Sequence, residues 1–329
     1  MTCKKLSKYY YQEIQGDEHG IVLGSLTKDG DNLEARISLA YGANLCQFSL
    51  NKKMIIDYEP KLLKSSDFTG TPILYPTPNR VENGVFEFNG NIYDQVKRGR
   101  RIFEHGLVYD EPWKIVQINA NKNQASLIAK IDWNKDCALY KAFPFIHDLT
   151  IVYELDCEGI TITYKIHNKD YESIPFGFGL HPYFQKLSGD ADTKIRVPVT
   201  HVMEATEELL PTGNLVPIQE SELCLNEINS IGEYDLDHVF LRSVKDGPAI
   251  IQYLQQGFMV EITSTDDFSY FVIYSPKDEA YFCIEEQTCS TNAHNLYNQG
   301  YREISGLKFV PCDEVMQGKV RYSISPLIN

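Results

Sequence analysis

One hairpin constrains the fold of this chain more than any other feature. Two segments rich in β-branched residues, Leu149 to Leu155 and Ile160 to Ile166, are separated by Asp156 to Gly159. This arrangement predicts two antiparallel strands joined by a four-residue loop that ends in glycine. In the second segment, apolar and polar side chains alternate, which predicts a sheet with one buried face and one solvated face.

Similar short segments recur along the chain, with Gly, Asn, Asp or Pro clusters between them. They are Leu33 to Leu39, Ser126 to Ile131, Phe258 to Thr263, Tyr270 to Tyr274 and Tyr281 to Glu285. Their spacing is typical of a sandwich or barrel and not of βαβ units. We expect one short helix at Asp57 to Lys64. Because no repeat or linker-like stretch divides the chain, we expect an all-β fold in a single domain over residues 1–329.

Composition excludes several classes of partner. The chain has 21 Tyr and 16 Phe, which favour strands. Its net charge of −14 repels phosphate backbones and anionic lipids, so we expect neither nucleic acid nor a membrane as a partner. No segment approaches the roughly 18 apolar residues of a membrane-spanning helix. The first residues lack the apolar core of a secretory signal.

The cysteine pattern indicates neither a zinc site nor a disulfide framework. Eight cysteines, at positions 3, 46, 137, 157, 224, 283, 289 and 312, form no Cys-x-x-Cys pair and have no histidines at zinc-site spacing. We therefore expect free thiols, a reducing cytoplasmic location and no bound metal.

Three well-separated segments contain the residues of an acid–base site. His105 precedes Gly106, His181 precedes Pro182, and Glu285 ends a predicted strand. Histidine and glutamate are common general acids and bases because their pKa values can be brought near neutral pH. A single histidine in a β protein is more often structural, so the prediction rests on the three residues together.

The residues around the two histidines have their own interpretation. Gly106 has no side chain, so another group can approach the His105 imidazole closely. Pro182 favours an extended backbone at His181. Glycines at 177 and 179 either leave room for a ligand beside the strand or permit a close crossing of two strands.

Glu285 and Glu286 are adjacent on a predicted strand, so their side chains point to opposite faces of the sheet. Only one of them can face the site. This argues against a glycosidase built on the pair, because such an enzyme needs both carboxyl groups beside one bond. The other glutamate is expected to point to solvent or to form an ion pair.

Further polar residues have two interpretations each. Arg80 lies in a loop, Pro76 to Phe86, that leads into a strand, and it could bind two neighbouring ligand hydroxyls or pair with a carboxylate such as Glu82. Asp237 could accept hydrogen bonds from a ligand or cap a turn. The basic run Lys97 to Arg101 is either a solvated loop or an anion site for a phosphorylated substrate.

Taken in order, the motifs resemble those of the aldose 1-epimerase (galactose mutarotase) family over roughly residues 20 to 325. They are Pro78-Asn79-Arg80 followed by Gly84, His105-Gly106, Gly179-Leu180-His181-Pro182-Tyr183-Phe184, Pro211-Thr212-Gly213, Leu236-Asp237-His238-Val239-Phe240 and Ile284-Glu285-x-Gln287-Thr288. The chain departs from the family at Glu286, where proline is usual. The resemblance implies a large antiparallel β-sandwich of the galactose-mutarotase type that binds a small-molecule sugar.

The resemblance also implies a role for each residue. Glu285 corresponds to the general base, His181 to the general acid, His105 to a second histidine near the ring oxygen, Arg80 and Asp237 to ligands of sugar hydroxyls, and Asn79 to a neighbour of that arginine. Such a site interconverts the α and β anomers of free aldohexoses, galactose or glucose, by acid–base opening and closing of the ring. This chemistry needs no metal or redox cofactor.

Two alternatives stay open. A hexose-6-phosphate 1-epimerase would use the basic run before His105 to bind phosphate. A non-catalytic carbohydrate-binding protein on the same fold would need hydroxyl ligands and aromatic rings, but no acid and base around an anomeric carbon. The sequence leaves the preferred sugar and the oligomeric state open.

Overall fold

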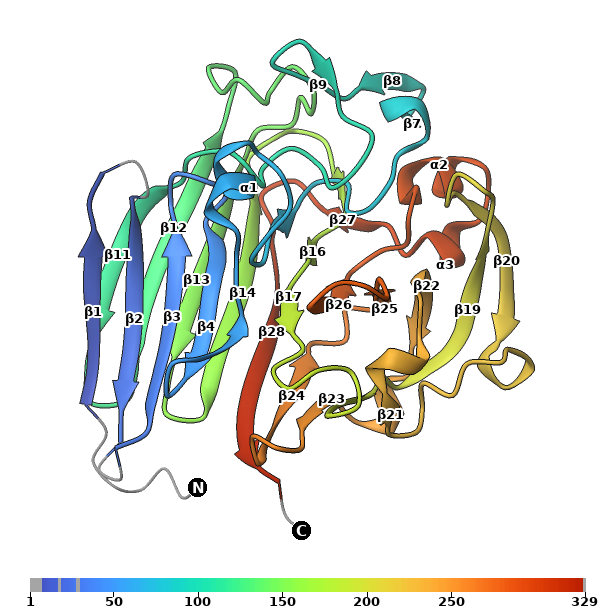
Figure 1. Ribbon diagram of the computed structural model, residues 1–329. Coiled ribbons are helices and arrows are strands. Elements are labelled where there is room, and N and C mark those ends of the chain that lie inside the picture. The colour runs from blue at the N-terminus through green and yellow to red at the C-terminus, as the bar shows by residue number, and fades with distance from the viewer. Residues whose placement is uncertain (1–7, 17–18, 28–29, 328–329) are drawn as a thin grey trace.

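Two large antiparallel sheets form the computed structural model, which describes residues 8–16, 19–27 and 30–327 (Figure 1). The larger sheet has 13 strands. In spatial order they are β1 (Lys8–Ile14), β2 (Gly20–Leu26), β3 (Asn32–Ser38), β4 (Asn44–Leu50), β5 (Lys53–Ile56), β17 (Tyr183–Gln185), β26 (Tyr281–Gln287), β25 (Tyr270–Tyr274), β22 (Asp237–Arg242), β19 (Val199–Ala205) and β20 (Pro211–Pro217), with β16 (Gly179–Leu180) beside β26 and β6 (Ile73–Leu74) beside β16.

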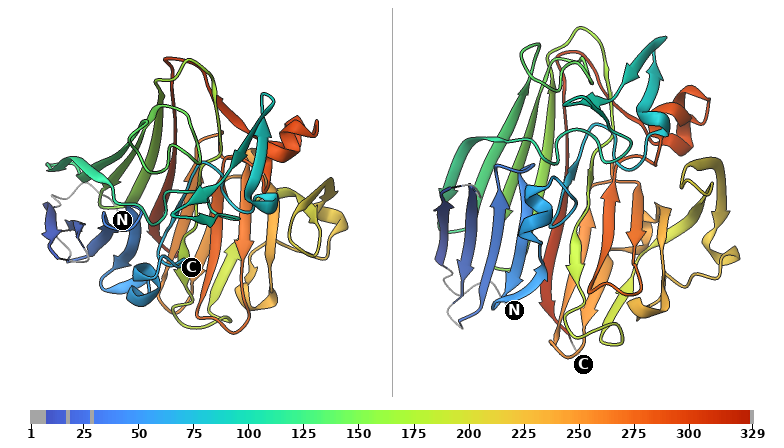
Figure 2. Two further views of the ribbon diagram at one scale, coloured as in Figure 1. Left: turned by 90° about the horizontal axis from the view of Figure 1, so that it is seen from above. Right: turned by 45° about the horizontal axis from the view of Figure 1, so that its top comes forward.

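The second sheet has nine strands and lies against the first. Its order is β11 (Lys114–Ala120), β12 (Ala125–Trp133), β13 (His147–Leu155), β14 (Gly159–Asn168), β28 (Val315–Pro326), β24 (Phe258–Ser264), β23 (Ala249–Tyr253), β18 (Thr193–Arg196) and β21 (Asn229–Ser230). Figure 2 shows β1–β4 and β11–β14 as separate layers. The predicted all-β fold is therefore confirmed.

Short elements connect the sheets. Three strand pairs lie outside them: β7 (Val85–Phe88) with β8 (Asn91–Asp94), β9 (Val96–Lys97) with β10 (Arg100–Arg101), and β15 (Ile174–Phe176) with β27 (Lys308–Val310). The helices are α1 (Pro60–Lys64), α2 (Ala293–Asn298) and α3 (Arg302–Ser305), and the 3-10 turns are η1 (Glu82–Gly84), η2 (Ile218–Glu220), η3 (Ile231–Glu233) and η4 (Val244–Asp246). No helix within the described ranges has the length and apolar character needed to cross a membrane.

The hairpin expected from the sequence is β13 and β14, in which Leu155 pairs with Ile160. The alternating side chains of β14 are buried and partly exposed in turn, as predicted. The expected helix is confirmed in part. It begins at Pro60, because the Glu59 carboxylate caps it by accepting a hydrogen bond from the Lys61 amide, and proline suits the first helical position.

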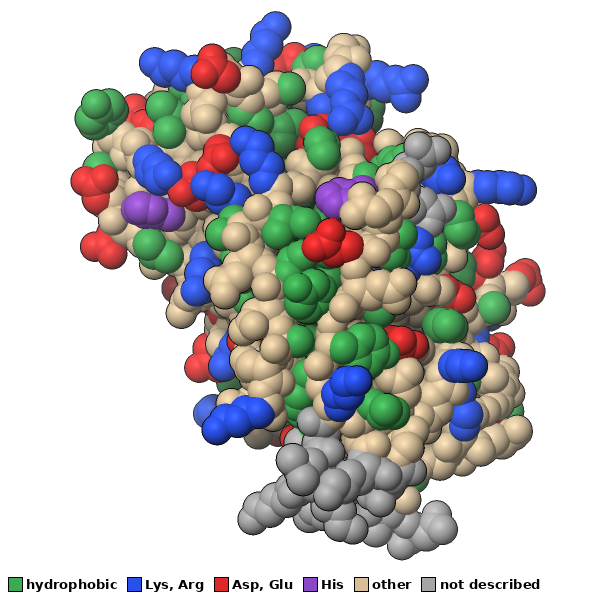
Figure 3. All heavy atoms as spheres, turned by 90° about the vertical axis from the view of Figure 1, so that its left-hand side faces the viewer, with side chains coloured by type: hydrophobic (Ala, Val, Ile, Leu, Met, Phe, Trp, Pro, Cys, Tyr) green, Lys and Arg blue, Asp and Glu red, His purple; other side chains and the backbone are tan. Residues whose placement is uncertain are grey.

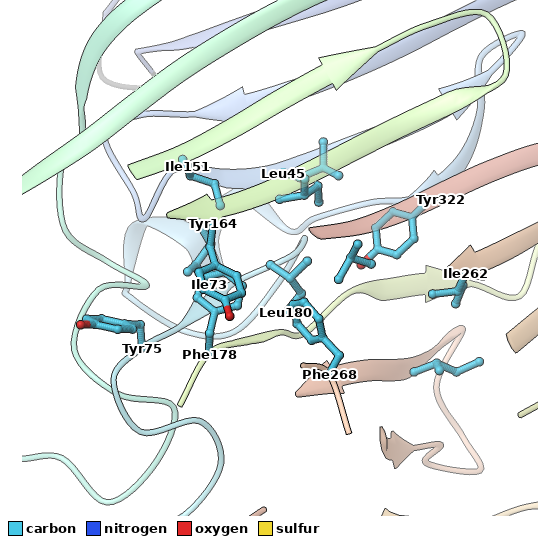
Figure 4. Packing of buried hydrophobic residues seen from close by; sticks show 14 of the residues in the cluster. Leu45, Ile73, Tyr75, Ile151, Tyr164, Phe178, Leu180, Ile262, Phe268 and Tyr322 are labelled. Carbon is cyan, nitrogen blue, oxygen red and sulfur yellow. The ribbon is translucent and has the colours of Figure 1, made fainter. Parts of the chain in front are cut away.

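Apolar side chains from both sheets fill the space between them (Figure 4). Leu45 and Leu180 come from the larger sheet, and Ile151, Tyr164 and Ile262 from the smaller one, and all are almost fully buried. Burial of apolar surface on this scale is the main force that holds the layers together. A single domain over residues 1–329 stays a prediction.

The surface charges and the cysteines can be compared with the expected acidic surface and free thiols. On the side drawn in Figure 3, acidic and basic side chains are interspersed, so the negative charge is not gathered there. Six cysteines, at positions 46, 137, 224, 283, 289 and 312, form no disulfide. Cys157 is disulfide-bonded, so the prediction of free thiols is wrong at this residue, and Cys3 lies outside the described residues. Disulfides are uncommon in reducing compartments, and the cytoplasmic location stays a prediction.

Candidate active site

The pairing of β26 with its neighbours brings His181 opposite Glu285. Gly179 pairs with Gln287 and Tyr183 pairs with Cys283, so His181, midway between β16 and β17, lies across from Glu285. The His181 Nε2 atom is 3.3 Å from the Glu285 Oε1 atom. Both residues are almost fully buried. Two of the three residues predicted to perform acid–base chemistry are therefore in direct contact.

His105 joins this pair from a loop. Its ring packs edge-on against the His181 ring, with centroids 5.1 Å apart. The His105 amide donates a hydrogen bond to the Asn79 carbonyl oxygen, and the backbone has a positive φ of 61° at His105 and 74° at Gly106. A Cβ atom on Gly106 would lie 2.3 Å from the Tyr75 carbonyl oxygen. Gly106 therefore permits a close approach, as predicted, but the approaching group is backbone.

Arg80 and Asp237 form the polar edge of the site. An Arg80 guanidinium nitrogen is 3.3 Å from Asp237 Oδ2, and the Asn79 Oδ1 atom accepts hydrogen bonds from the Arg80 amide at 2.7 Å and from the guanidinium at 3.3 Å. Arg80 thus pairs with Asp237 and, at 4.0 Å, with Glu104, and not with Glu82. The side chains of Arg80 and Asp237 are 30% and 34% exposed, so both can also reach a ligand.

The two adjacent glutamates have opposite surroundings. Glu286 pairs with Phe271, which pairs with Phe240, so its side chain shares the core face of the sheet with two buried phenylalanines. Glu286 is fully buried, and neither carboxyl oxygen has a hydrogen-bond partner. The prediction that it points to solvent or to an ion pair is therefore wrong. Glu285, on the other face, accepts a hydrogen bond from Gln287 Nε2 at 2.9 Å.

Burial shifts the protonation of Glu285, His181 and His105 toward the neutral form. It raises the pKa of Glu285 well above its ordinary value and lowers the pKa of His181 to about 3. It also lowers the pKa of His105, with smaller contributions from His181 and Arg80. The physical cause is loss of water, which stabilises charged forms. Burial therefore favours the neutral form of both groups that meet in the 3.3 Å contact.

The glycines before His181 serve packing. A Cβ atom on Gly177 would lie 2.2 Å from the Cys289 Sγ atom and 2.6 Å from the Pro78 ring. A Cβ atom on Gly179 would lie 3.0 Å from Gln287 Cγ. Of the two interpretations of this motif, the packing one is favoured, although the groups that approach are side chains and not a crossing strand, and the glycines leave no open space for a ligand.

Sequence reasoning missed the aromatic surroundings of the histidines. The Phe68 ring, in the loop after α1, lies edge-on to His105 at 4.5 Å and parallel to His181 at 6.4 Å. Tyr183 stacks on His181 with centroids 4.9 Å apart. Tyr183 and Gln287 each lie two residues beyond a predicted site residue, which places them on the same side of the strand. No sequence signal identifies Phe68.

Three of the four basic residues in the run before His105 are engaged with carboxylates, and the fourth, Arg100, is exposed. The ion pairs of the run are Lys97 with Asp110 and Glu111, Arg98 with Asp110 and Glu111, and Arg101 with Asp94. This favours a structural loop over an anion site. Across the described part of the chain, no three or more His, Cys, Asp or Glu residues are grouped in a way that could hold a metal ion.

Known proteins share the fold, and a family model matches most of the sequence. A galactose mutarotase-like protein from Clostridium acetobutylicum superimposes with a TM-score of 0.82 at 21% identity, covering 97% of this chain and 99% of its own. Galactose 1-epimerase from Lactobacillus acidophilus NCFM gives a TM-score of 0.73 at 15% identity, covering 98% and 99%. The YihR protein of Escherichia coli (strain K12) is 23% identical over 261 residues, or 77% of this chain and 80% of its own. The family model for aldose 1-epimerase matches residues 25–323, so the chain belongs to the aldose 1-epimerase family.

Proposed function

We propose that this protein is a mutarotase that interconverts the α and β anomers of a free aldohexose, galactose or glucose. The observation that carries the proposal is the 3.3 Å contact between Glu285 and His181 in a buried site. A proton acceptor and a proton donor in contact, next to a pair of hydroxyl-binding groups, is the arrangement that ring opening requires. Family membership and fold support a sugar epimerase of the mutarotase type.

In the proposed reaction, Glu285 takes the proton from the C1 hydroxyl while His181 gives a proton to the ring oxygen. The C1–O5 bond then breaks, and the C1–O1 bond becomes a carbonyl. Rotation about C1–C2 presents the other face of the aldehyde. The ring closes when Glu285 gives its proton to the carbonyl oxygen and His181 takes the proton back from the O5 hydroxyl, so the protein ends in its starting state and needs no cofactor.

The proposed cycle begins with Glu285 as a carboxylate and His181 as an imidazolium. Burial favours the other position of the shared proton, with neutral carboxyl and neutral imidazole. That neutral form is the one reached after ring opening, when Glu285 has gained a proton and His181 has lost one. Ring opening therefore requires the shared proton to lie on His181, the less favoured of its two positions in the buried pair.

The remaining residues position the sugar. Arg80 and Asp237 would bind neighbouring hydroxyls, and Asn79 holds the Arg80 guanidinium through its Oδ1 atom. Burial favours the neutral form of His105, whose ring lies 5.1 Å from that of His181, so it can exchange a hydrogen bond with a sugar bound beside His181. These contacts hold the anomeric carbon over the acid–base pair.

The two alternative functions predict results that differ from those of a mutarotase when several sugars are tested. A hexose-6-phosphate 1-epimerase would need a free cationic site, and three of the four basic residues in the run that could supply it are paired with carboxylates. A carbohydrate-binding protein would bind sugar without accelerating mutarotation. Polarimetry of glucose, galactose and their 6-phosphates tests all three. We expect acceleration with the free sugars. A strict requirement for phosphate, or binding of sugar with no acceleration, would contradict the proposal.

A further inference from the structure

Phe68, a half-buried residue in the loop after α1, touches both histidines of the site and has no part in the proposed reaction. Its ring lies edge-on to His105, with centroids 4.5 Å apart, and parallel to His181 at 6.4 Å. A further ring, that of Tyr109, packs on it at 4.9 Å. Phe68 therefore covers the two imidazoles from the side of this loop.

Hydrogen bonds fix the backbone at and after Phe68. The Asp67 carboxylate accepts a hydrogen bond from the Phe68 amide at 3.1 Å. The next residue, Thr69, is held twice, because its Oγ1 atom accepts from the Glu59 amide at 2.8 Å and its carbonyl oxygen accepts from Asn44 Nδ2 at 2.8 Å. The fold therefore determines where the Phe68 ring lies.

A cavity of about 220 Å³ lies against the same ring. Phe68 and Tyr183 line it, and the exposed Leu62 lies at its rim. Within the described part of the chain, its lining includes neither Glu285 nor either histidine of the site. Since Tyr183 stacks on His181 at 4.9 Å and Phe68 packs on both histidines, these two rings separate the acid–base site from solvent that enters the cavity.

The strand order places this cavity and the proposed sugar ligands on opposite sides of the acid–base pair. Tyr183, on β17, lines the cavity, and Glu285 lies on the neighbouring β26. Asp237, which contacts Arg80, lies two strands further on, on β22. A sugar held by Arg80 and Asp237 therefore reaches the pair from the side away from the cavity.

Exclusion of water matters because the pair works with one shared proton. Burial is the largest cause of the low pKa of both His105 and His181. Without the Phe68 ring, the cavity would extend to both imidazoles, and water would stabilise their charged forms. A second proton would then bind to the pair at a higher pH, and Glu285 could no longer act as a base.

The charged and titratable groups around the histidines all stay in place when Phe68 is replaced. Arg80 disfavours a positive charge on either histidine. The other such groups are Glu285, Glu286 and Cys283 on β26, Tyr183 on β17, Asp237 on β22, and Glu104 and Tyr109 in loops. A change in pH dependence on replacing Phe68 therefore reports on hydration.

We propose that Phe68 is a positioning residue that acts through His105 and His181: its ring keeps water from the two imidazoles and thereby sets the acid limit of the pH range in which the acid–base pair works. This inference rests on the proposed mutarotase activity for the reaction itself. It assigns the tolerance of acid to one side chain that takes no proton.

The first test measures kcat/KM for mutarotation of glucose and galactose between pH 4.5 and pH 7.5. It compares wild type with Phe68→Ala, with the conservative variant Phe68→Leu, and with Leu62→Ala. Leu62→Ala is the matched control, because it removes apolar atoms from the rim of the same cavity and leaves the Phe68 ring in place.

Between pH 6.5 and pH 4.5, we expect kcat/KM to fall by less than about twofold in wild type and Leu62→Ala. In Phe68→Ala it should fall by roughly fivefold or more, because a group whose pKa rises to about 5.2 is mostly protonated at pH 4.5. Phe68→Leu should restore most of the difference. An unchanged pH profile in Phe68→Ala, the same loss or gain at every pH, or an acid limb in Leu62→Ala as well would overturn the inference.

Titration of the imidazole signals by NMR separates this inference from the proposed function, because it requires no activity. His105→Asn and His181→Asn assign the two signals. In wild type we expect neither midpoint above pH 4.5, and in Phe68→Ala at least one midpoint at pH 5 or above. Equal midpoints in both proteins would overturn the inference, whatever the mutarotation assay shows. Phe68→Thr, which also removes the ring, takes the place of Phe68→Ala if that variant fails to fold.

Discussion

The two faces of β26 place chemically identical side chains in opposite situations. Glu285 faces the loops, where it contacts His181 and accepts a hydrogen bond from Gln287. Glu286 faces the core, where its carboxyl group has no hydrogen-bond partner. Burial raises both pKa values, so burial alone does not distinguish a functional carboxyl group. What distinguishes Glu285 is a proton-exchanging partner within reach.

The largest expected effect is a difference in activity between the two faces. Glu285→Gln and His181→Asn should each lower kcat/KM for mutarotation by about 10² to 10⁴, the usual contribution of one positioned acid or base. Glu286→Gln should leave it within a few-fold of wild type. Polarimetry at equal protein concentration measures all three. Near-wild-type rates in Glu285→Gln and His181→Asn would remove the basis for the assignment.

Glu286 should instead control stability as a function of pH. Burial raises its pKa from 4.5 to about 8, so its contribution to stability is fully present below pH 4.5 and is lost as the pH rises toward 8. This change of pKa corresponds to roughly 5 kcal/mol. Glu286→Gln cannot ionise, so it should gain stability relative to wild type between pH 5 and pH 8.

Urea denaturation at the two pH values measures this change, with the exposed Glu279→Gln as a control that should show no such trend. The same free-energy difference between Glu286→Gln and wild type at pH 5 and pH 8 would show that Glu286 does not titrate in the core as described.

A smaller effect is expected from the backbone that holds His105. Gly106→Ala combines a positive φ with a Cβ atom 2.3 Å from the Tyr75 carbonyl oxygen. The loop must shift, and a displacement of about 1 Å can lower a rate roughly 10²-fold. Gly90→Ala has the same φ of 74° and nothing within 4 Å of the new atom. It should cost only about 1 kcal/mol and leave the rate unchanged.

The two variants are compared by thermal unfolding and by kcat/KM. An equal rate in Gly106→Ala and Gly90→Ala would show that the exact placement of His105 is unimportant for the reaction.

The smallest expected effect is in the dependence of kcat/KM for mutarotation on pH. Because burial lowers the pKa of His181 to about 3, a second proton binds to the pair only in strong acid. The value of kcat/KM should therefore fall by less than about twofold when the pH is lowered from 6.5 to 4.5, with circular dichroism confirming that the protein stays folded. An acid limb centred near pH 6.5, the ordinary pKa of imidazole, would mean that His181 is not held neutral.

The comparison of the two glutamates also shows how far sequence reasoning reaches. The two-residue period of a strand predicts correctly that Glu285 and Glu286 face opposite sides. It cannot predict what lies on each side, because that depends on β25, β22 and the second sheet. Solvent or an ion pair was the reasonable expectation for Glu286, since buried carboxyl groups without partners are rare.

Contacts between distant segments are equally hard to predict from the sequence in the rest of the site. His181 and Glu285 come together through strand pairing, which the motif order and the family resemblance anticipate. Phe68 reaches both histidines from a loop after α1, a contact that follows from the path of the chain and leaves no local pattern. Gly177 and Gly179 were open to two interpretations, and only the positions of Cys289 and Pro78 decide for packing.

Exchange spectroscopy tests the central claim most directly, because it detects interconversion of anomers at equilibrium. The anomeric protons of galactose or glucose give separate NMR signals for the α and β forms. With wild-type protein we predict exchange cross-peaks between these signals at an unchanged α to β ratio, and none with Glu285→Gln. Sugar signals that broaden on binding while the anomers fail to exchange would contradict the account.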